Sequence, residues 1–369
     1  MKVLVTSTSL LPDYGGPAFS VSRLATALAE AGAKIGLWAA DQSAAITPLV
    51  PVGSSVQRII GTEAEALVCF GRIDILHDNG IWLPHNHRLA VLSERRGIPR
   101  VVSTRGMLEP WARSHKRLKK SFAWWLYQRR DLKHASCHHT TADAEARNVQ
   151  RLGLGVPVVA VPNGVDVPEE RPSVLGLPAE KAIRRGQRTA LFLGRIYPIK
   201  GLPILVQAWA RVRPDGWVLR IAGPDEAGHR QQVEKAVSDA GLNEVISFTG
   251  PIGHRMKKSA FFDADLFVLP SHSESFGMAV AEALAHGLPV LTTKRTPWSI
   301  LPETGCGWWV DATVDGIAQG LRQATILDSD TLQAMGAKGR ALAIAEFGWK
   351  RVADLMLSTY ESILANAMA

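Results

Sequence analysis

Arg195 and Lys200 are of a type and spacing suited to binding a diphosphate. They lie in the segment Gly194–Gly201, between a run typical of a buried strand (Ala190–Leu193) and a predicted helix. A guanidinium fork and an ammonium point charge at the carboxyl end of a strand can together neutralise two phosphates. Two solvated surface cations are the alternative, and the position after a strand favours binding.

Glu274 and Glu282 form a second group suited to sugar chemistry. Glu274 falls in the loop after the strand-like run Leu266–Leu269, and Glu282 falls about one turn into the predicted helix Met278–His286. Carboxylates can accept hydrogen bonds from sugar hydroxyls, and the N–H groups at the helix start can hold phosphate oxygens. The spacing alone leaves a capping role for Glu274 and a surface position for Glu282 open.

Gly15 and Gly16 occupy the loop after the first predicted strand. The loop lacks the G-x-G-x-x-G spacing, which argues against a nicotinamide or flavin enzyme. A glycine pair ahead of a helix lets backbone approach a phosphate, but it is equally compatible with a plain turn.

Four clusters carry residue types found in metal sites, and we predict that none of them binds metal. Asp263–Asp265 runs into a predicted strand and Asp328–Asp330 into a predicted helix, where capping accounts for the acids. His77–Asn79 and His85–His87 lack a matching set of ligands, and we interpret them as polar loops. The sequence thus predicts neither a metal nor a bound cofactor.

Positive charge is concentrated in one place. The net charge of +8 comes from residues 1–160, which hold 20 Lys and Arg against 12 Asp and Glu, whereas residues 161–369 balance at 22 each. Residues 111–134, here called the basic-aromatic segment, hold eight cations and one acid. We predict a basic amphipathic helix that docks on an anionic membrane surface. Packing of its aromatics into the domain, and binding of an anionic acceptor, remain alternatives. The residues expected to bind are Arg113, Lys116, Arg117, Lys119, Lys120, Trp124 and Trp125.

Strands and helices alternate along the whole chain, which is typical of parallel sheets covered on both faces. With 46% hydrophobic and 21% charged residues, the composition is that of a globular protein. The predicted strands are Lys2–Thr6, Ile73–Leu76, Val101–Ser103, Val158–Val161, Thr189–Leu193, Trp217–Ala222, Val245–Thr249, Leu266–Leu269 and Pro289–Thr292. The predicted helices are Ser20–Ala31, Leu202–Val212, Gln231–Ala240, Met278–His286 and Trp349–Ala369. A segment rich in Pro, Gly and charge, Val167–Arg188, is the expected linker.

Taken together, these features resemble the retaining glycosyltransferases of family 4. The likeness rests on Gly15-Gly16, Val161–Asp166, Gly194–Gly201 and the pair Glu274 and Glu282, in this order, and covers nearly the whole chain. It implies the GT-B fold, in which two Rossmann-like, doubly wound α/β domains face each other across a cleft. The domains would span 1–165, joined by a returning helix at about 349–369, and 166–348.

The resemblance implies a role for each matching residue. Arg195 and Lys200 would bind the donor diphosphate and stabilise the leaving nucleotide. Glu274 would contact the transferred sugar, and Glu282 the ribose. The remaining donor-binding residues would be Gly16 at the phosphates, Arg105 near the donor sugar, Gly250 and Ile252 at the base, and Phe276, Gly277, Met278 and Ala279 through their backbone.

One position departs from the family pattern. Many relatives place a histidine before a glycine in the first domain, near the donor sugar, and this chain has Arg105 before Gly106. Arg105 either takes over part of that role or meets an anionic group of a substrate.

The expected reaction is metal-independent, retaining transfer of a hexose from a nucleotide-diphosphate sugar to a hydroxyl of a glycan or lipid-linked acceptor, in cell-surface polysaccharide synthesis. The family likeness implies that the acceptor attacks from the leaving-group side and loses its proton to a phosphate oxygen. A nucleotide-sugar epimerase of the same fold and a nucleic-acid-binding protein are the alternatives, and we expect no nucleic-acid partner. With no signal or spanning segment visible, we expect a cytoplasmic protein, peripheral on the inner face of the membrane.

Overall fold

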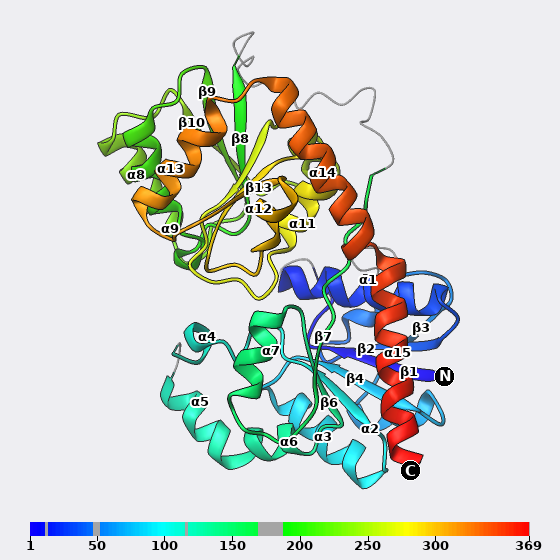
Figure 1. The fold of residues 1–369 in the computed structure, drawn as a ribbon. Coiled ribbons are helices and arrows are strands. Elements are labelled where there is room, and N and C mark those ends of the chain that lie inside the picture. The colour runs from blue at the N-terminus through cyan, green and yellow to red at the C-terminus, as the bar shows by residue number, and fades with distance from the viewer. Residues whose placement is uncertain (12–13, 47–51, 115–116, 169–186, 369) are drawn as a thin grey trace. The chain divides into compact units, whose positions relative to one another are not determined.

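The computed structural model describes residues 1–11, 14–46, 52–114, 117–168 and 187–368, and it divides into two α/β units (Figure 1). Unit 1 comprises Met1–Gly164 and Phe347–Ala369, and unit 2 comprises Val165–Glu346. Most of the expected linker, Val167–Arg188, lies outside the described residues.

Unit 1 is built on a sheet of seven parallel strands in the order β3-β2-β1-β4-β5-β6-β7. The strands are β1 (Lys2–Ser7), β2 (Lys34–Ala39), β3 (Val56–Ile59), β4 (Ile75–Asn79), β5 (Arg100–Ser103), β6 (Cys137–Thr140) and β7 (Val158–Ala160). The order reverses between β1 and β4, and open α/β sheets bind ligands at such a point, beyond the carboxyl ends of the strands.

Helices cover both faces of this sheet. They are α1 (Gly16–Glu30), η2 (Ser43–Ala45), α2 (Glu63–Cys69), α3 (Pro84–Arg95), α4 (Pro110–Ser114), α5 (Arg117–Ala123), η3 (Trp124–Gln128), α6 (Arg129–Lys133), α7 (Asp143–Gln150) and α15 (Trp349–Met368). The core on one face includes α1 and α15, which lie side by side in Figure 1, and the core on the other includes α2 and α3. Buried Trp349, Met356 and Tyr360 of α15 join the first core. A Cβ on Gly164 would come within 2.3 Å of the Trp349 ring, so the backbone approaches this ring closely.

Unit 2 has a six-stranded parallel sheet in the order β10-β9-β8-β11-β12-β13. The strands are β8 (Arg188–Leu193), β9 (Trp217–Ala222), β10 (Ile246–Gly250), β11 (Leu266–Leu269), β12 (Val290–Thr293) and β13 (Gly307–Val310). The helices are η4 (Pro198–Lys200), α8 (Leu202–Val212), α9 (His229–Asp239), α10 (His254–Phe262), α11 (Met278–Ala285), α12 (Ile300–Thr304), α13 (Val314–Thr325) and α14 (Ser329–Phe347). Its order reverses between β8 and β11. Two doubly wound parallel units confirm the predicted fold class.

Two expectations about local structure are wrong. The first helix starts at Gly16 rather than Ser20, because Pro17 fits the first helical turn, where no N–H is needed. The polar clusters are not loops: His77–Asn79 lies in strand β4, fully buried, and His85–His87 lies in helix α3. A neutral histidine can occupy a core when its ring nitrogens are hydrogen-bonded, so polarity alone did not indicate exposure.

Candidate functional site

The loops after β8 and β11 contact each other where the strand order of unit 2 reverses. The N–H of His272 donates to the carbonyl of Ile199 at 2.8 Å. Gly201 has a φ of 68°, and a Cβ there would come within 2.2 Å of the Pro270 carbonyl oxygen. Only glycine satisfies both conditions without strain. This glycine therefore permits the close approach of the two loops.

That approach brings Lys200 and Glu274 together. Lys200 Nζ lies 2.6 Å from Glu274 Oε1, and Ser271 Oγ donates to the same oxygen at 2.7 Å. The lysine and glutamate side chains are only 17% and 12% exposed. A short, shielded, charge-assisted contact of this kind is much stronger than a surface ion pair. An incoming anion would compete with Glu274 for the ammonium.

Arg195 has a different partner. Its guanidinium pairs with Glu226, which follows β9, and both side chains are largely exposed, at 55% and 40%. Exposed pairs contribute little, because water screens them and the long side chains lose freedom. Arg195 is therefore held loosely and can be redirected to a ligand at small cost. The sequence offered no reason to single out Glu226.

The start of α11 is fixed by Trp298. Its indole Nε1 donates to the carbonyl of Phe276 at 2.6 Å, and the two rings pack with centroids 5.3 Å apart. Gly277 then turns into the helix with a φ of 84°, and Met278 and Ala279 form the first turn. The N–H groups of this turn have no side-chain cap, so they could bind phosphate oxygens.

Glu282 is held within α11 by a lysine that the sequence did not reveal. Lys257 of α10 places its Nζ 2.6 Å from Glu282 Oε1, and the glutamate is 12% exposed. This excludes the surface position left open for Glu282. Gly250 ends the edge strand β10 with a φ of 70°, and Ile252 lies half-buried two residues later.

In unit 1, Arg105 follows β5, near the reversal of strand order. Its Nη2 and Nε donate to Asn79 Oδ1 at 2.6 and 3.2 Å. Its Nη1 donates to Asn163 Oδ1 at 2.7 Å and to Ser20 Oγ at 3.1 Å. Ser20 lies one turn beyond Gly16 in α1, so Arg105 sits beside the start of that helix. A Cβ on Gly16 would meet no atom within 4 Å among those described.

A buried chain of hydrogen bonds lies beneath this arginine. His77 bonds to the Tyr360 hydroxyl at 2.5 Å and to Ser103 Oγ at 2.6 Å, and Ser103 Oγ lies 2.6 Å from His139 Nδ1. Burial, followed by the charge of Arg105, lowers the pKa of His139 to about 3. Burial likewise depresses the pKa of His77 well below 6.5. Both rings are therefore neutral at pH 7.

The basic-aromatic segment differs from the single regular helix predicted for it. The described part runs through α4, α5, η3 and α6, and η3 is a π-helical turn that shifts the helical faces. Its inner face is anchored on Trp82: the ring packs against Trp124, and the Tyr127 hydroxyl donates to the Trp82 carbonyl at 2.6 Å. Trp124 therefore packs inward, in contrast to its expected role at a membrane.

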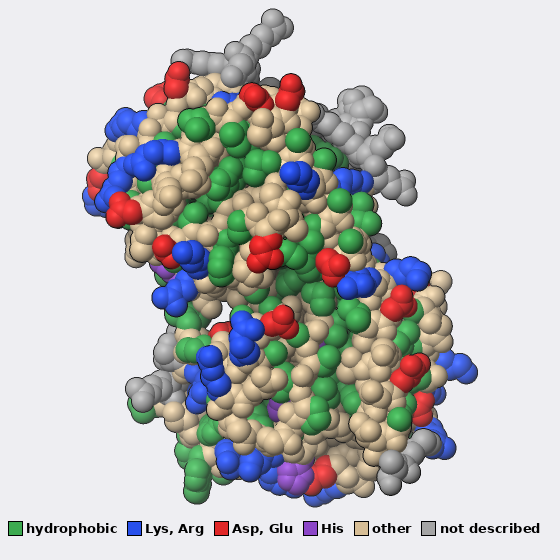
Figure 2. Space-filling model, in the orientation of Figure 1, with side chains coloured by type: hydrophobic (Ala, Val, Ile, Leu, Met, Phe, Trp, Pro, Cys, Tyr) green, Lys and Arg blue, Asp and Glu red, His purple; other side chains and the backbone are tan. Residues whose placement is uncertain are grey.

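The outer face of this segment is apolar and exposed. Leu118, Phe122, Trp125 and Leu126 are 87%, 65%, 83% and 58% exposed. Figure 2 shows hydrophobic side chains projecting at the lower left, where Figure 1 draws α5, with Lys and Arg beside them. The alternative in which the aromatic side chains pack into the domain is therefore wrong for Phe122 and Trp125.

Cations surround the same segment. Lys119 is exposed, Arg113 stacks over Trp124 at 5.5 Å, and Lys120 Nζ bonds to the Ala112 carbonyl. Arg117 begins α5, and Lys116 lies outside the described residues.

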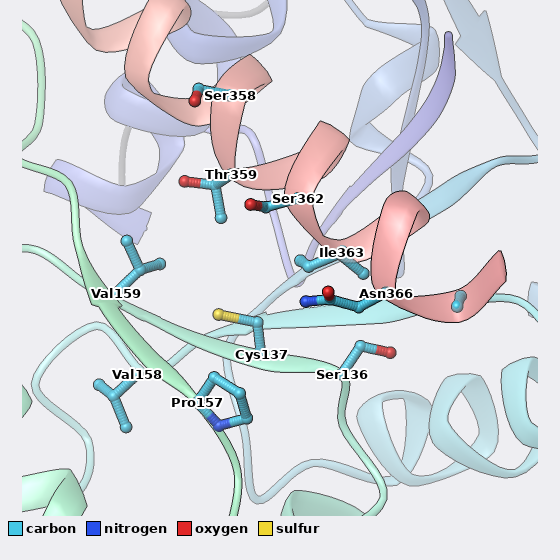
Figure 3. Close-up of a pocket in the computed structure, with 11 residues that line it drawn as sticks. Ser136, Cys137, Pro157, Val158, Val159, Ser358, Thr359, Ser362, Ile363 and Asn366 are labelled. Carbon is cyan, nitrogen blue, oxygen red and sulfur yellow. The ribbon is translucent and has the colours of Figure 1, made fainter. Parts of the chain in front are cut away.

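A cavity of about 590 Å³ lies elsewhere in unit 1, between α15 and the strands β6 and β7 (Figure 3). Cys137, Val159, Ser362 and Asn366 line it, and it contains none of the predicted site residues. Burial raises the pKa of Cys137 to about 11, so its thiol is unreactive.

The acidic pairs have structural partners. Asp265 accepts a hydrogen bond from the Thr189 N–H at 2.7 Å, and Asp328 caps α14 by accepting from the Thr331 N–H at 2.7 Å. In the described part of the chain, no cluster of three His, Cys, Asp or Glu side chains is placed to hold a metal ion. None of the helices described has the length and apolar character needed to span a bilayer.

Each unit matches a glycosyltransferase family model. Residues 15–164 match the model of the glycosyl transferase 4-like domain, and residues 177–342 match that of glycosyl transferases group 1. A D-inositol 3-phosphate glycosyltransferase of Nocardia farcinica is 31% identical over 213 residues, which are 55% of this chain and 47% of that protein. The match thus spans about half of this relative's length.

Two solved structures share the fold along the whole chain. Sucrose-phosphate synthase from Thermosynechococcus elongatus superimposes with a TM-score of 0.80 at 20% identity, covering 99% of this chain and 100% of that one. Anabaena HepE in complex with UDP and glucose gives a TM-score of 0.74 at 19% identity, covering 98% and 100%. The fold is therefore GT-B, and with both family models matched, the chain belongs to the glycosyl transferases of group 1, family 4.

Proposed function

We propose that this protein is a retaining glycosyltransferase that moves a hexose from a nucleotide-diphosphate sugar to a hydroxyl of a glycan or lipid-linked acceptor, in cell-surface polysaccharide synthesis. The observation that carries the proposal is the shielded cluster of Lys200, Glu274 and Ser271 at the reversal of strand order in unit 2. The UDP and glucose held by HepE are consistent with it.

The proposed chemistry follows from charge. Cleavage of the sugar–phosphate bond builds negative charge on the diphosphate and positive charge on the sugar ring. Lys200, Arg195 and the uncapped start of α11 would stabilise the diphosphate, which needs no metal. Once the diphosphate draws Lys200 away, the carboxylate of Glu274 would be available to the sugar. Glu282, oriented by Lys257, would accept hydrogen bonds from the ribose.

A ligand screen tests this proposal most directly. We expect one nucleoside diphosphate among UDP, GDP and ADP to raise the melting temperature of the purified chain, and its sugar to be turned over in the presence of EDTA. Release of nucleotide without any acceptor would instead favour an epimerase. Binding to random DNA that falls steeply with salt would favour a nucleic-acid-binding protein.

We further propose that the basic-aromatic segment docks on an anionic membrane, where a lipid-linked acceptor would be found. Four exposed apolar side chains beside Lys and Arg suit the headgroup boundary, and each cation near an anionic surface contributes about 1 kcal/mol. The inner face is already occupied by contacts to Trp82, so the apolar side chains face outward.

Liposome co-sedimentation with and without phosphatidylglycerol tests this docking. We expect wild-type protein to pellet with anionic vesicles, and replacement of Leu118, Phe122, Trp125 and Leu126 by Ser to abolish pelleting. Replacement of Lys116, Arg117, Lys119 and Lys120 by Ser should abolish the preference for phosphatidylglycerol. Ile326→Ser, at a residue 80% exposed in unit 2, is the matched control and should change nothing. Wild-type protein that stays in the supernatant at low salt contradicts the proposal.

A further inference from the structure

Arg105 is a cation whose hydrogen-bond partners, among the described residues, are neutral. The oxygens that it contacts belong to Asn79, Asn163 and Ser20, which are two amides and a hydroxyl. Within the described ranges it forms no ion pair, unlike Arg100, which lies in the same unit and contacts Asp78 at 3.4 Å. A half-buried guanidinium without an ion-pair partner is costly, because neutral oxygens only partly replace the water it has lost.

The surrounding groups offset this charge only in part. Burial lowers the pKa of Arg105 to about 10, so it still carries its proton at pH 7. The rings of His77 and His139 are neutral, as described above. The carboxylate of Glu145 favours the charged form of Arg105, but burial outweighs it. The hydrogen bonds of this carboxylate are to Thr104 Oγ1 and the Gly106 N–H, both at 2.6 Å, rather than to the guanidinium.

The arginine is held in a fixed orientation. Its four hydrogen bonds to described residues use four of the five N–H groups of a guanidinium, and among those residues the second N–H of Nη2 has no acceptor. The backbone of Arg105 has a φ of 49°, in the left-handed region that costs a non-glycine residue roughly 1 kcal/mol or more. Strain of this kind, together with an unpaired charge, is typical of a binding residue rather than of a residue that stabilises the fold.

The position of Arg105 is accessible to a ligand. The side chain is only partly buried, and it lies beyond the carboxyl ends of β4 and β5, next to the reversal of strand order in unit 1. One turn before its partner Ser20, Gly16 leaves open space among the described atoms at the start of α1.

We infer that Arg105 is the centre of an anion-binding subsite of unit 1, which binds a phosphate or carboxylate group carried by the acceptor. The inference deepens the proposed function, on which it rests for the identity of the acceptor as a sugar substrate. It assigns Arg105 to the acceptor rather than to the donor diphosphate.

Inorganic phosphate is the probe that tests this subsite. The chain is first saturated with the nucleoside diphosphate that stabilises it most, so that the donor diphosphate site is filled. Phosphate is then titrated by calorimetry at constant ionic strength, with chloride as the reference anion. We expect phosphate to bind, and Arg105→Gln to weaken this binding about tenfold or more, as loss of a charge-assisted contact would.

Two further variants keep the test decisive. Arg105→Lys should retain part of the binding, and Arg151→Gln, which removes an exposed arginine of the same unit, should retain all of it. Phosphate binding that is unchanged in a folded Arg105→Gln variant overturns the inference. So does competition, if the nucleotide abolishes phosphate binding by the wild type, because Arg105 would then serve the donor.

Failure of the proposed function would be recognised separately. If no nucleoside diphosphate stabilises the chain, the same phosphate titration is carried out without nucleotide on Lys200→Ala. This variant lacks the lysine proposed to bind the diphosphate in unit 2. Phosphate binding that depends on Arg105 in that variant still supports the subsite, and its absence overturns it.

Discussion

The two units hold their functional cations in different ways. In unit 2, Lys200 and Lys257 each contact a glutamate at 2.6 Å, and Arg195 pairs with Glu226. In unit 1, Arg105 is fixed by two amides and a hydroxyl. An anion entering unit 2 must displace a carboxylate, whereas an anion entering unit 1 would form the ion pair that Arg105 lacks within the described part of the chain. The first arrangement suits exchange of a ligand at each turnover, and the second suits recognition.

The two units also differ in their buried histidines. This difference should have its largest effect on stability in acid. Burial lowers the pKa of His138 to about 4 and of His139 to about 3, and it lowers the pKa of His77 well below its usual 6.5. In unit 2, burial lowers the pKa of His286 to about 4. The unfolded chain takes up protons below pH 6.5 and these folded rings do not, so stability present above pH 6.5 is lost as pH falls toward 4.

We therefore expect unit 1 to open first in acid. Between pH 7 and pH 5 each such histidine lowers the free energy of unfolding by about 2 kcal/mol, and unit 1 holds His77, His138 and His139 against His286 in unit 2. Asp78 of unit 1, whose pKa burial raises to about 6, offsets only part of this loss. Hydrogen exchange read by mass spectrometry should show loss of protection in peptides from β4 and β6 before those from β11 and β12. Simultaneous loss of protection would mean that the units do not differ in this way.

Removal of Lys200 should have the largest effect on catalysis. Lys200→Ala is expected to lower kcat by a factor of about 100 to 1000, because loss of a group that stabilises developing charge costs ~3–4 kcal/mol. Arg195→Ala should also lower kcat by orders of magnitude. Lys235→Ala is the matched control: its 2.7 Å pair with Asp239 is exposed, and kcat should not change. A folded Lys200→Ala enzyme with normal kcat would contradict the proposal that Lys200 stabilises the donor diphosphate.

Replacement of the two glutamates of unit 2 should have smaller effects, and the effect should differ between Glu282 and Glu274. Glu282→Gln keeps the shape of the side chain but loses the charge paired with Lys257, and it should chiefly weaken nucleoside diphosphate binding, by about tenfold. Glu274→Gln should chiefly lower kcat with the sugar donor. Calorimetry with the nucleotide and initial rates with the sugar distinguish the two. Equal losses of both quantities in both variants would show that the roles are shared.

The sequence predicted unit 2 better than unit 1, for a physical reason. Strands Trp217–Ala222 and Leu266–Leu269 and helix Leu202–Val212 are found with the predicted bounds, because each is an apolar run between clear turns. In unit 1, β4 combines Ile75 and Leu76 with a polar end, His77–Asn79, and the burial of that end depends on partners far along the chain.

The sequence likewise predicted some residues of the candidate site and missed others. The residue types and their spacing in the sequence indicated Lys200 and Glu274 as site residues, because their loops follow adjacent parallel strands. They could not indicate Lys257 or Asn79, since each acts through a contact between distant elements. The exposure of Trp125 against the packing of Trp124 was equally hidden, because a π-helical turn decides it.

Helix α15 has a consequence for how the chain folds as it is synthesised. Trp349, Val352, Met356 and Tyr360 complete the core of unit 1, yet they leave the ribosome after all of unit 2. Until then the face of the sheet beside α1 lacks its cover, and His77 lacks the Tyr360 hydroxyl. Unit 2 is contiguous and can fold as it emerges, whereas unit 1 must wait with apolar surface open to chaperones. The order of folding is thus the reverse of the order in which the two units begin.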